Sequence, residues 1–198
     1  VCAVALAFVH LVIAPVMTPV AAYSVKVFGA PMRRAAASLG DGASPANQDL
    51  ILVNSPDYLM FVSYVPAVRS FEGKPTPSRV RGLVAGPVAV EVSRPDERAV
   101  RMRLSGGLYE GPVGRLFRSD RGPLRVGDAV ALPGMETRVN ALAKDGQPRD
   151  VTFRFGVTLE DPSLRWARWE RDGYVRFIPP PVGQAVILPA ARIPIPGL

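Results

Sequence analysis

The hydrophobic pattern begins with an unbroken apolar run at the N-terminal end of the chain. Residues 1–25 contain no Asp, Glu, Lys or Arg, and the first basic residues after them are Lys26, Arg33 and Arg34. About 20 apolar residues span a bilayer as a helix, whereas a secretory signal peptide has a basic start and a shorter apolar stretch. The pattern therefore predicts a transmembrane helix over residues 1–28.

Two prolines and a histidine within this run favour a helix that has helical neighbours. Pro15 and Pro19 each remove a backbone hydrogen bond, and in lipid the freed carbonyls are tolerated mainly where neighbouring helices satisfy them. His10 is interpreted as a polar contact with such a neighbour, with a functional group inside the membrane as the alternative. We therefore expect the last helix of a multi-pass protein. A core helix of a soluble protein is the competing interpretation.

A short polar stretch separates the apolar run from the pattern of a folded domain. Residues 29–48 are small or polar and are broken by Gly and Pro, which predicts a juxtamembrane linker that begins with the end of the helix. Asp49–Asn54 has the continuous apolar character of a buried strand. Ser55 is followed by Pro and Asp, which together mark a helix start with Ser55 as the cap. The helix is apolar nearly all round, so we expect it to be buried and to run to about Phe71.

From residue 78 onward the period shifts to two, which predicts strands. In the run "RAVRMRL", the apolar residues Val100, Met102 and Leu104 alternate with arginines and are expected on the core face. The runs "METRVNALA" and "RDVTFRF" predict one hairpin, and "LRWARWE" and "YVRFI" predict another. The expected fold class is an α+β, mainly antiparallel β soluble domain over residues 49–198, with one N-terminal βα unit and a transmembrane helix before it.

Two similar nonapeptides, "VGDAVALPG" (126–134) and "VGQAVILPA" (182–190), occur in the second half of the chain. A structural repeat should hold over about 20 residues or more, and the sequences that flank these two segments disagree. The match is interpreted as one local device used twice, in which Gly turns the chain, an apolar strand follows and Pro ends it.

Composition narrows the chemistry that is open to this chain. The 198 residues carry a net charge of +7 and include one Cys and one His, both within the apolar run. The following domain therefore lacks the residues of Ser-His-Asp and Cys-His nucleophile systems and of the usual zinc sites. It also lacks the glycine motifs that bind nucleotides and any recognisable nucleic-acid module. The sequence predicts no catalytic residue, no cofactor, no metal and no nucleic-acid partner.

Four arginines on predicted strands are the first candidate contact residues: Arg79, Arg81, Arg101 and Arg103. If they share the outward side of one meander, they form a basic face that attracts anionic lipid, with each residue adding up to about 1 kcal/mol. The alternative is an ordinary charged sheet surface that Glu91 and neighbouring acids neutralise.

Trp166 and Trp169 are the second pair of candidate contact residues. On a strand, residues three apart point to opposite faces, so one indole can lie in the core and the other outside, whereas on a helix the two would share a face. An exposed Trp would indicate contact with a protein partner or a ligand. Core and edge packing of a hairpin is the alternative interpretation.

Four segments carry a resemblance to a known class of proteins: "HLVIAPVMTP", "DLILVNSPD", "LEDPSLRWARWERDG" and "PPPVGQAVILP". Together they resemble the C-terminal region of uncharacterised multi-pass membrane proteins from GC-rich bacteria. The resemblance covers most of the chain. It implies a membrane location and no known activity, so it assigns no functional residue.

The function expected from the sequence is that of an accessory soluble domain of a multi-pass membrane protein, with an interaction or structural role. The alternative is a lid or scaffold domain of a membrane enzyme or transporter whose reacting groups lie on other helices. A third possibility, an independent carbohydrate- or peptide-binding β domain, requires an exposed Trp beside a groove. Because basic residues follow the apolar run, the positive-inside rule places the domain on the cytoplasmic side of a bacterial inner membrane.

Overall fold

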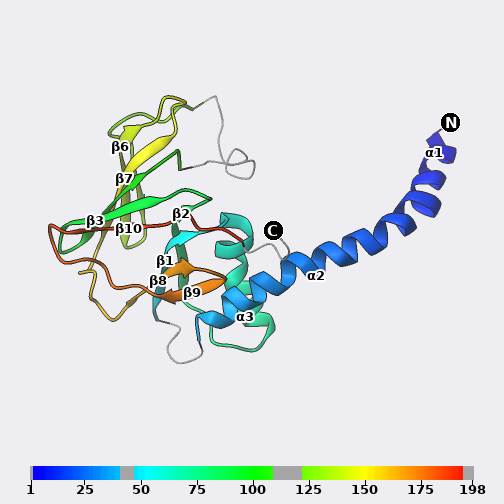
Figure 1. Cartoon of the computed structure of the whole chain (residues 1–198), viewed down its shortest axis with the longest axis horizontal. Coiled ribbons are helices and arrows are strands. Elements are labelled where there is room, and N and C mark those ends of the chain that lie inside the picture. The colour runs from blue at the N-terminus through cyan, green and yellow to red at the C-terminus, as the bar shows by residue number, and fades with distance from the viewer. Residues whose placement is uncertain (1, 41–46, 109–121, 194–198) are drawn as a thin grey trace.

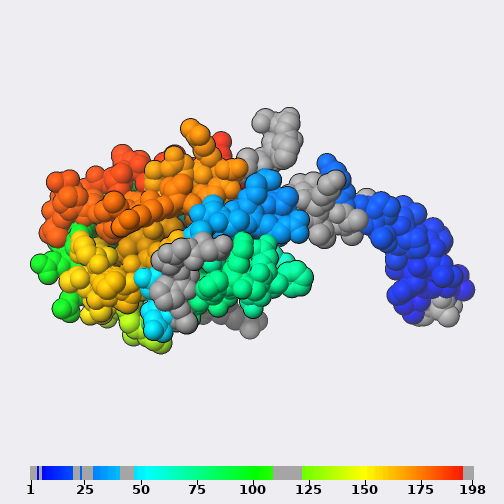
Figure 2. Space-filling model, turned by 90° about the horizontal axis from the view of Figure 1, so that it is seen from below, coloured from blue at the N-terminus to red at the C-terminus, as the bar shows by residue number. Residues whose placement is uncertain are grey.

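A helical arm projects from a β-rich body (Figures 1 and 2). The computed structural model describes residues 2–40, 47–108 and 122–193. Three helical segments follow one another directly at its N-terminal end: α1 (Cys2–Phe8), the π-helical segment η1 (Val9–Ile13) and α2 (Ala14–Ser38). We call residues 2–29 the helical arm.

Three polar groups of the helical arm form hydrogen bonds within the arm itself. The π-helical turn lies directly before Pro15, and the Ala14 N–H donates to the Val9 carbonyl, five residues back. Thr18 Oγ1 donates to the carbonyl of Ala14 at 2.9 Å. The Nδ1 atom of His10 lies 3.0 Å from the carbonyl oxygen of Leu6, so this ring bonds to its own helix.

The transmembrane helix predicted over residues 1–28 is not found as such. Within the described residues, no helix combines the length and the apolar character that crossing a membrane requires. The physical reason is that the apolar run is divided among α1, η1 and the first half of α2. The longest of these, α2, continues through Lys26, Arg33 and Arg34.

The predicted juxtamembrane segment, residues 29–48, begins with the end of a helix. α2 continues to Ser38, and its last turns pack against the body, where Ala35, Ala36 and Leu39 are buried. The small side chains of this stretch allow the helix to approach the body closely. Residues 41–46 of the predicted linker lie outside the described residues.

The first sheet has four strands in the order β2-β1-β8-β9. Its strands are β1 (Asp49–Ser55), β2 (Arg79–Ala85), β8 (Leu164–Glu170) and β9 (Gly173–Arg176). β1 is parallel to both β2 and β8, and β9 returns antiparallel to β8. Between β1 and β2 lie the π-helical segment η2 (Tyr58–Ser63) and α3 (Tyr64–Phe71). The predicted N-terminal βα unit is confirmed.

The second sheet has six antiparallel strands in the order β10-β3-β4-β7-β6-β5. Its strands are β3 (Val90–Asp96), β4 (Ala99–Leu104), β5 (Ala129–Leu132), β6 (Met135–Leu142), β7 (Pro148–Phe155) and β10 (Ala185–Leu188). The α+β, mainly antiparallel class is confirmed. The two similar nonapeptides contain β5 and β10, so the shared device of Gly, strand and Pro forms the two opposite edges of this sheet.

The body has three layers, with the four-stranded sheet in the middle. Along β1, Leu50 and Leu52 pack toward α2, η2 and β9, whereas Ile51 and Val53 pack toward the six-stranded sheet. A strand that is buried on both faces has a continuous apolar run, as predicted for this segment. Burial of one such side chain stabilises the fold by about 1.5–3 kcal/mol.

The alternating patterns are confirmed by the burial of their apolar members. Val100, Met102 and Leu104 of β4 are at most 8 % exposed, and Val151, Phe153 and Phe155 of β7 at most 5 %. All six belong to the core between the two sheets.

The helix start after β1 differs from the prediction. Asp57, and not Ser55, is the cap, because its backbone is extended and its Oδ1 accepts a hydrogen bond from the Met60 N–H at 2.8 Å. The segment ends at Phe71 as expected, but it is not buried all round. Tyr58, Leu59 and Tyr64 are each more than 40 % exposed.

Candidate functional site

Arg79 and Arg81 lie on β2, where both hold the same buried acid. Asp49, at the start of β1, is 7 % exposed. Its Oδ1 lies 2.8 Å from Arg79 Nε, and its Oδ2 lies 3.4 Å from Arg81 Nε. Both arginines also donate to the carbonyl oxygen of Pro133, in the β5–β6 turn. The pair therefore braces the four-stranded sheet against the six-stranded one.

Arg101 and Arg103 lie on β4 and hold a different acid, Asp150 of β7. Arg101 donates to both carboxylate oxygens, at 2.8 and 2.7 Å, and Arg103 Nε donates to Oδ2 at 3.2 Å. Asn140 is the third residue that donates, through Nδ2 to Oδ1 at 2.8 Å. Burial alone would raise the pKa of Asp150, but these hydrogen bonds outweigh it and hold the pKa below its ordinary value.

The four arginines therefore do not form the one basic face that their alternation suggested. β2 belongs to the four-stranded sheet and β4 to the six-stranded sheet. Each pair of arginines is matched by a buried carboxylate, which reduces the charge it presents to solvent. The sequence could not reveal this separation, because it depends on β2 pairing with β1 and not with β3.

The two tryptophans point to opposite faces of β8, as expected, but neither is outside. Trp166 is 6 % and Trp169 is 4 % exposed. The Trp166 ring meets Phe155 edge-on at 5.2 Å in the core between the sheets. Trp169 meets Phe61 and Tyr174 edge-on, each at 5.2 Å, on the helix side. Both faces of this sheet are covered. The exposed Trp that a carbohydrate- or peptide-binding domain would require is therefore not found at Trp166 or Trp169.

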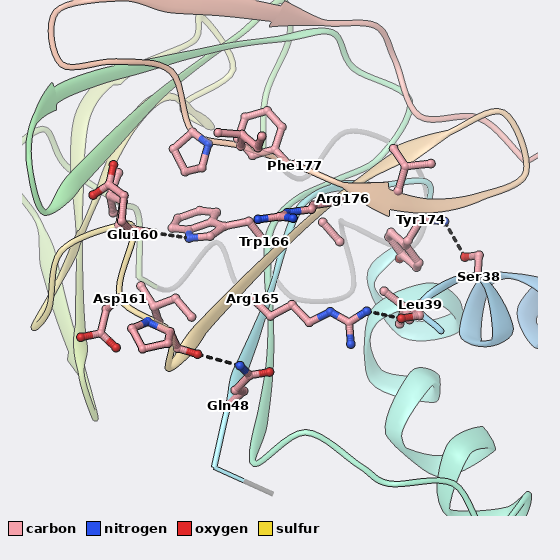
Figure 3. Close-up of a pocket in the computed structure, with 17 residues that line it drawn as sticks. Ser38, Leu39, Gln48, Glu160, Asp161, Arg165, Trp166, Tyr174, Arg176 and Phe177 are labelled. Atoms are coloured by element: carbon pink, nitrogen blue, oxygen red, sulfur yellow. Dashed lines mark hydrogen bonds between the residues drawn. The ribbon is translucent and has the colours of Figure 1, made fainter. Parts of the chain in front are cut away.

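A surface groove of about 580 Å³ runs along β8 and β9 (Figure 3). Trp166 and Phe177 contribute to its apolar floor, and Glu160 and Asp161 lie at one end of it. Hydrogen bonds from Arg94 hold the pKa of Glu160 below its usual value, and those from Ser163 do the same for Asp161. Two ionised carboxylates without a raised pKa do not make a general acid.

The other end of the groove is basic. Arg165 donates to the carbonyl of Leu39 there, and burial followed by the nearby charge of Arg69 lowers the pKa of Arg165. Gln48 Nε2 donates to the Pro162 carbonyl at 2.7 Å. Within the described ranges, no group of three His, Cys, Asp or Glu side chains is placed to hold a metal ion. The groove offers polar binding contacts and lacks a nucleophile paired with a base.

The C-terminal end of α2 is clamped to the body by residues that the sequence did not single out. Arg69, 2 % exposed, donates to the Ala36 carbonyl at 3.3 Å and to the Pro75 carbonyl at 2.9 Å. The Leu39 carbonyl accepts from Arg165. Cations near helix C-terminal carbonyls are favourable because they complement the helix dipole. The sequence offered one signal of this contact, because Arg69 is a single charged residue on the buried face of the apolar helix α3.

Ser38 completes this clamp on the side of β9. Its Oγ accepts a hydrogen bond from the Tyr174 N–H at 2.7 Å and donates to the Ala35 carbonyl at 2.8 Å. Gly173 lies so close that an added Cβ would meet Ser38 Oγ at 2.8 Å. α2, which continues the arm, is thus joined to the body through a close contact.

The helical arm, which projects away from the body (Figure 2), presents many of its described apolar side chains to solvent. Their exposed fractions run from 42 % for Ile13 to 76 % for Leu11. The set is Val4, Leu6, Phe8, Val9, Leu11, Val12, Ile13, Val16, Met17 and Tyr23. A continuous apolar surface of this kind marks a site that another apolar surface covers.

Neither a protein-family model, nor a curated protein, nor a solved structure matches this chain.

Proposed function

We propose that the chain is the accessory interaction domain of a multi-pass membrane protein, with the helical arm packed among lipid and neighbouring helices. The observation that supports this proposal is the row of exposed apolar side chains on the arm. Each large apolar side chain left in water forgoes about 1.5–3 kcal/mol of burial energy. Ten such residues on one projecting helical arm are stable only where lipid or protein replaces the water.

The contacts that fix the C-terminal end of α2 to the body support the same proposal. Arg69 and Arg165 both donate to carbonyls at the end of α2, so the helix and the body are joined as one unit. An arm that served only as a flexible tether would need no such contact. The body is therefore held at a fixed orientation to whatever surrounds the arm.

A lid or scaffold domain of a membrane enzyme or transporter is the second candidate, and the same clamp favours it. A body that is rigidly joined to one helix moves when that helix moves, which is the property a lid requires. In this version the reacting groups lie on other helices of the membrane protein. In both versions the basic residues after the apolar run favour the cytoplasmic side of a bacterial inner membrane.

Fractionation of cells that express the full chain tests the proposal. We expect the chain in the membrane pellet, and we expect a variant with Leu11→Glu and Val16→Glu on the arm to move to the supernatant. The matched control carries Ile178→Glu and Ile187→Glu, which change two residues of the body with similar exposure, 74 % and 73 %. A wild-type chain in the supernatant, or equal behaviour of the two variants, would contradict the proposal.

A further inference from the structure

We propose that the end of the body beside the arm rests on the headgroups of an anionic membrane. The contact is made by the exposed face of η2 and α3 and by Arg33 and Arg34 of α2. This inference depends on the proposed membrane location of the arm. The proposed lipid-contacting surface is separate from the arginines of β2 and β4, which buried acids already neutralise.

The first observation is an exposed apolar and aromatic face on η2 and α3. Phe71 is 95 % exposed, Tyr64 is 47 % and Leu59 is 44 %. The opposite side of the same segment supplies Phe61, Val62 and Val65 to the core. An aromatic residue left almost fully in water is unfavourable, whereas aromatic side chains are stable at the level of lipid headgroups.

The second observation is the positive charge on α2 where the arm meets the body. Arg33 and Arg34 are both exposed on α2. Within the part of the chain that the structure describes, neither has an ion pair or a side-chain hydrogen bond. These two arginines differ in this respect from the four on β2 and β4, each of which pairs with an acid. Exposed cations beside an apolar helix attract anionic lipid.

The third observation is the position of the two features. α2 packs directly against α3. Figures 1 and 2 both place α3 at the end of the body from which the arm departs. The exposed face of η2 and α3 therefore lies at the end of the body from which the arm departs. A membrane that receives the arm would meet this end of the body first.

Depth-dependent fluorescence quenching tests whether this end touches lipid. The full chain carrying Phe71→Trp is reconstituted into vesicles that contain phosphatidylserine and a headgroup-level nitroxide lipid. We expect the new indole to be quenched, while the two native indoles, which are buried, give a constant background. The matched control is Val130→Trp on β5, a 56 % exposed site on the far sheet, which should not be quenched. Equal quenching of the two sites, or quenching of neither, would overturn the inference.

A charge-matched pair of variants tests the role of the arginines. In competition between phosphatidylcholine vesicles and vesicles with added phosphatidylserine, we expect the wild-type chain to prefer the anionic ones. Arg33→Gln with Arg34→Gln should reduce that preference by up to about 25-fold, and raised salt should weaken it. Arg125→Gln with Arg149→Gln removes the same charge from exposed arginines elsewhere and should leave the preference unchanged.

The two proposals fail in distinguishable ways. A chain that floats with neither kind of vesicle contradicts the membrane location of the arm, and the inference falls with it. A chain that floats equally with both kinds, with no effect of Arg33→Gln and Arg34→Gln, overturns the headgroup contact alone.

Discussion

The hydroxyl of Tyr174, on β9, lies 2.7 Å from the hydroxyl of Ser55, at the end of β1, and donates to the Phe61 carbonyl at 3.0 Å. Burial raises the pKa of Tyr174 above its usual range, so the phenol stays protonated and remains a donor. The Tyr174 side chain thus joins β9, at the edge of the sheet, to β1 and to η2. The same residue's amide bonds to Ser38 of α2.

Tyr174→Phe should therefore lower the free energy of unfolding by about 1–2 kcal/mol, because the Phe61 carbonyl is left buried without its donor. Chemical denaturation of the full chain in detergent, followed by tryptophan fluorescence, measures the change. Tyr64→Phe is the matched control, since this phenol is 47 % exposed and should change stability by less than about 0.5 kcal/mol. Equal effects of the two substitutions would show that the buried hydroxyl contributes nothing special.

Gly173→Ala should loosen the junction between the arm and the body. An added Cβ would lie 2.8 Å from Ser38 Oγ and 2.9 Å from Ser38 Cβ, so α2 or β9 must shift. We expect a loss of about 1–3 kcal/mol and faster hydrogen exchange of the Tyr174 amide, which Ser38 protects. Gly156→Ala is the control, because its nearest neighbour lies at 3.8 Å. An unchanged exchange rate in Gly173→Ala would contradict the clamp.

Much of the fold could be predicted because alternation is a local property. The patterns of β4 and β7 place Val100, Met102 and Phe153 on the core face, and no long-range knowledge is needed to see this. The same holds for β1, whose continuous apolar run indicates a strand with both faces covered. The end of α3 at Phe71 was also predicted.

The candidate site was harder to predict because its residues depend on contacts between distant segments. Trp169 is buried only because the helical layer covers that face of the sheet. Arg79 and Arg101 lie apart because β2 and β4 enter different sheets. Arg69 and Arg165 acquire their role from the end of α2, and the sequence does not show that this helix end packs against the body.

Replacing Arg94 should lower the free energy of unfolding far more than replacing Glu160, the acid with which it pairs. Arg94 is 6 % exposed and donates to the carbonyls of Asp96, Glu97 and Pro180 as well as to Glu160. Arg94→Met leaves several carbonyls without donors, and we expect a loss of about 3 kcal/mol. Glu160 is largely exposed, so Glu160→Gln should cost less than about 1 kcal/mol. Denaturation of both variants checks this order, and similar losses would contradict it.

The acid side of the stability profile should depend on Asp150. The pKa of Asp150 is lower in the folded chain than its ordinary value of 3.8, although burial opposes the shift, because Arg101, Asn140 and Arg103 donate to the carboxylate. The folded state therefore binds the proton less readily than the unfolded state does. This contribution to stability is present above about pH 4 and is lost as the pH falls through the lowered folded pKa.

Asp150→Asn should consequently lower the free energy of unfolding at pH 7 by about 1–3 kcal/mol, and the gap from wild type should narrow as the pH falls below about 4. Denaturant titrations at pH 7, 5, 4 and 3 measure both quantities on the full chain. Asp172→Asn, at an exposed turn, should give a curve parallel to that of wild type over the same range. A gap for Asp150→Asn that stays constant down to pH 3, or widens, would show that the carboxylate is not held in its ionised form by Arg101 and Arg103.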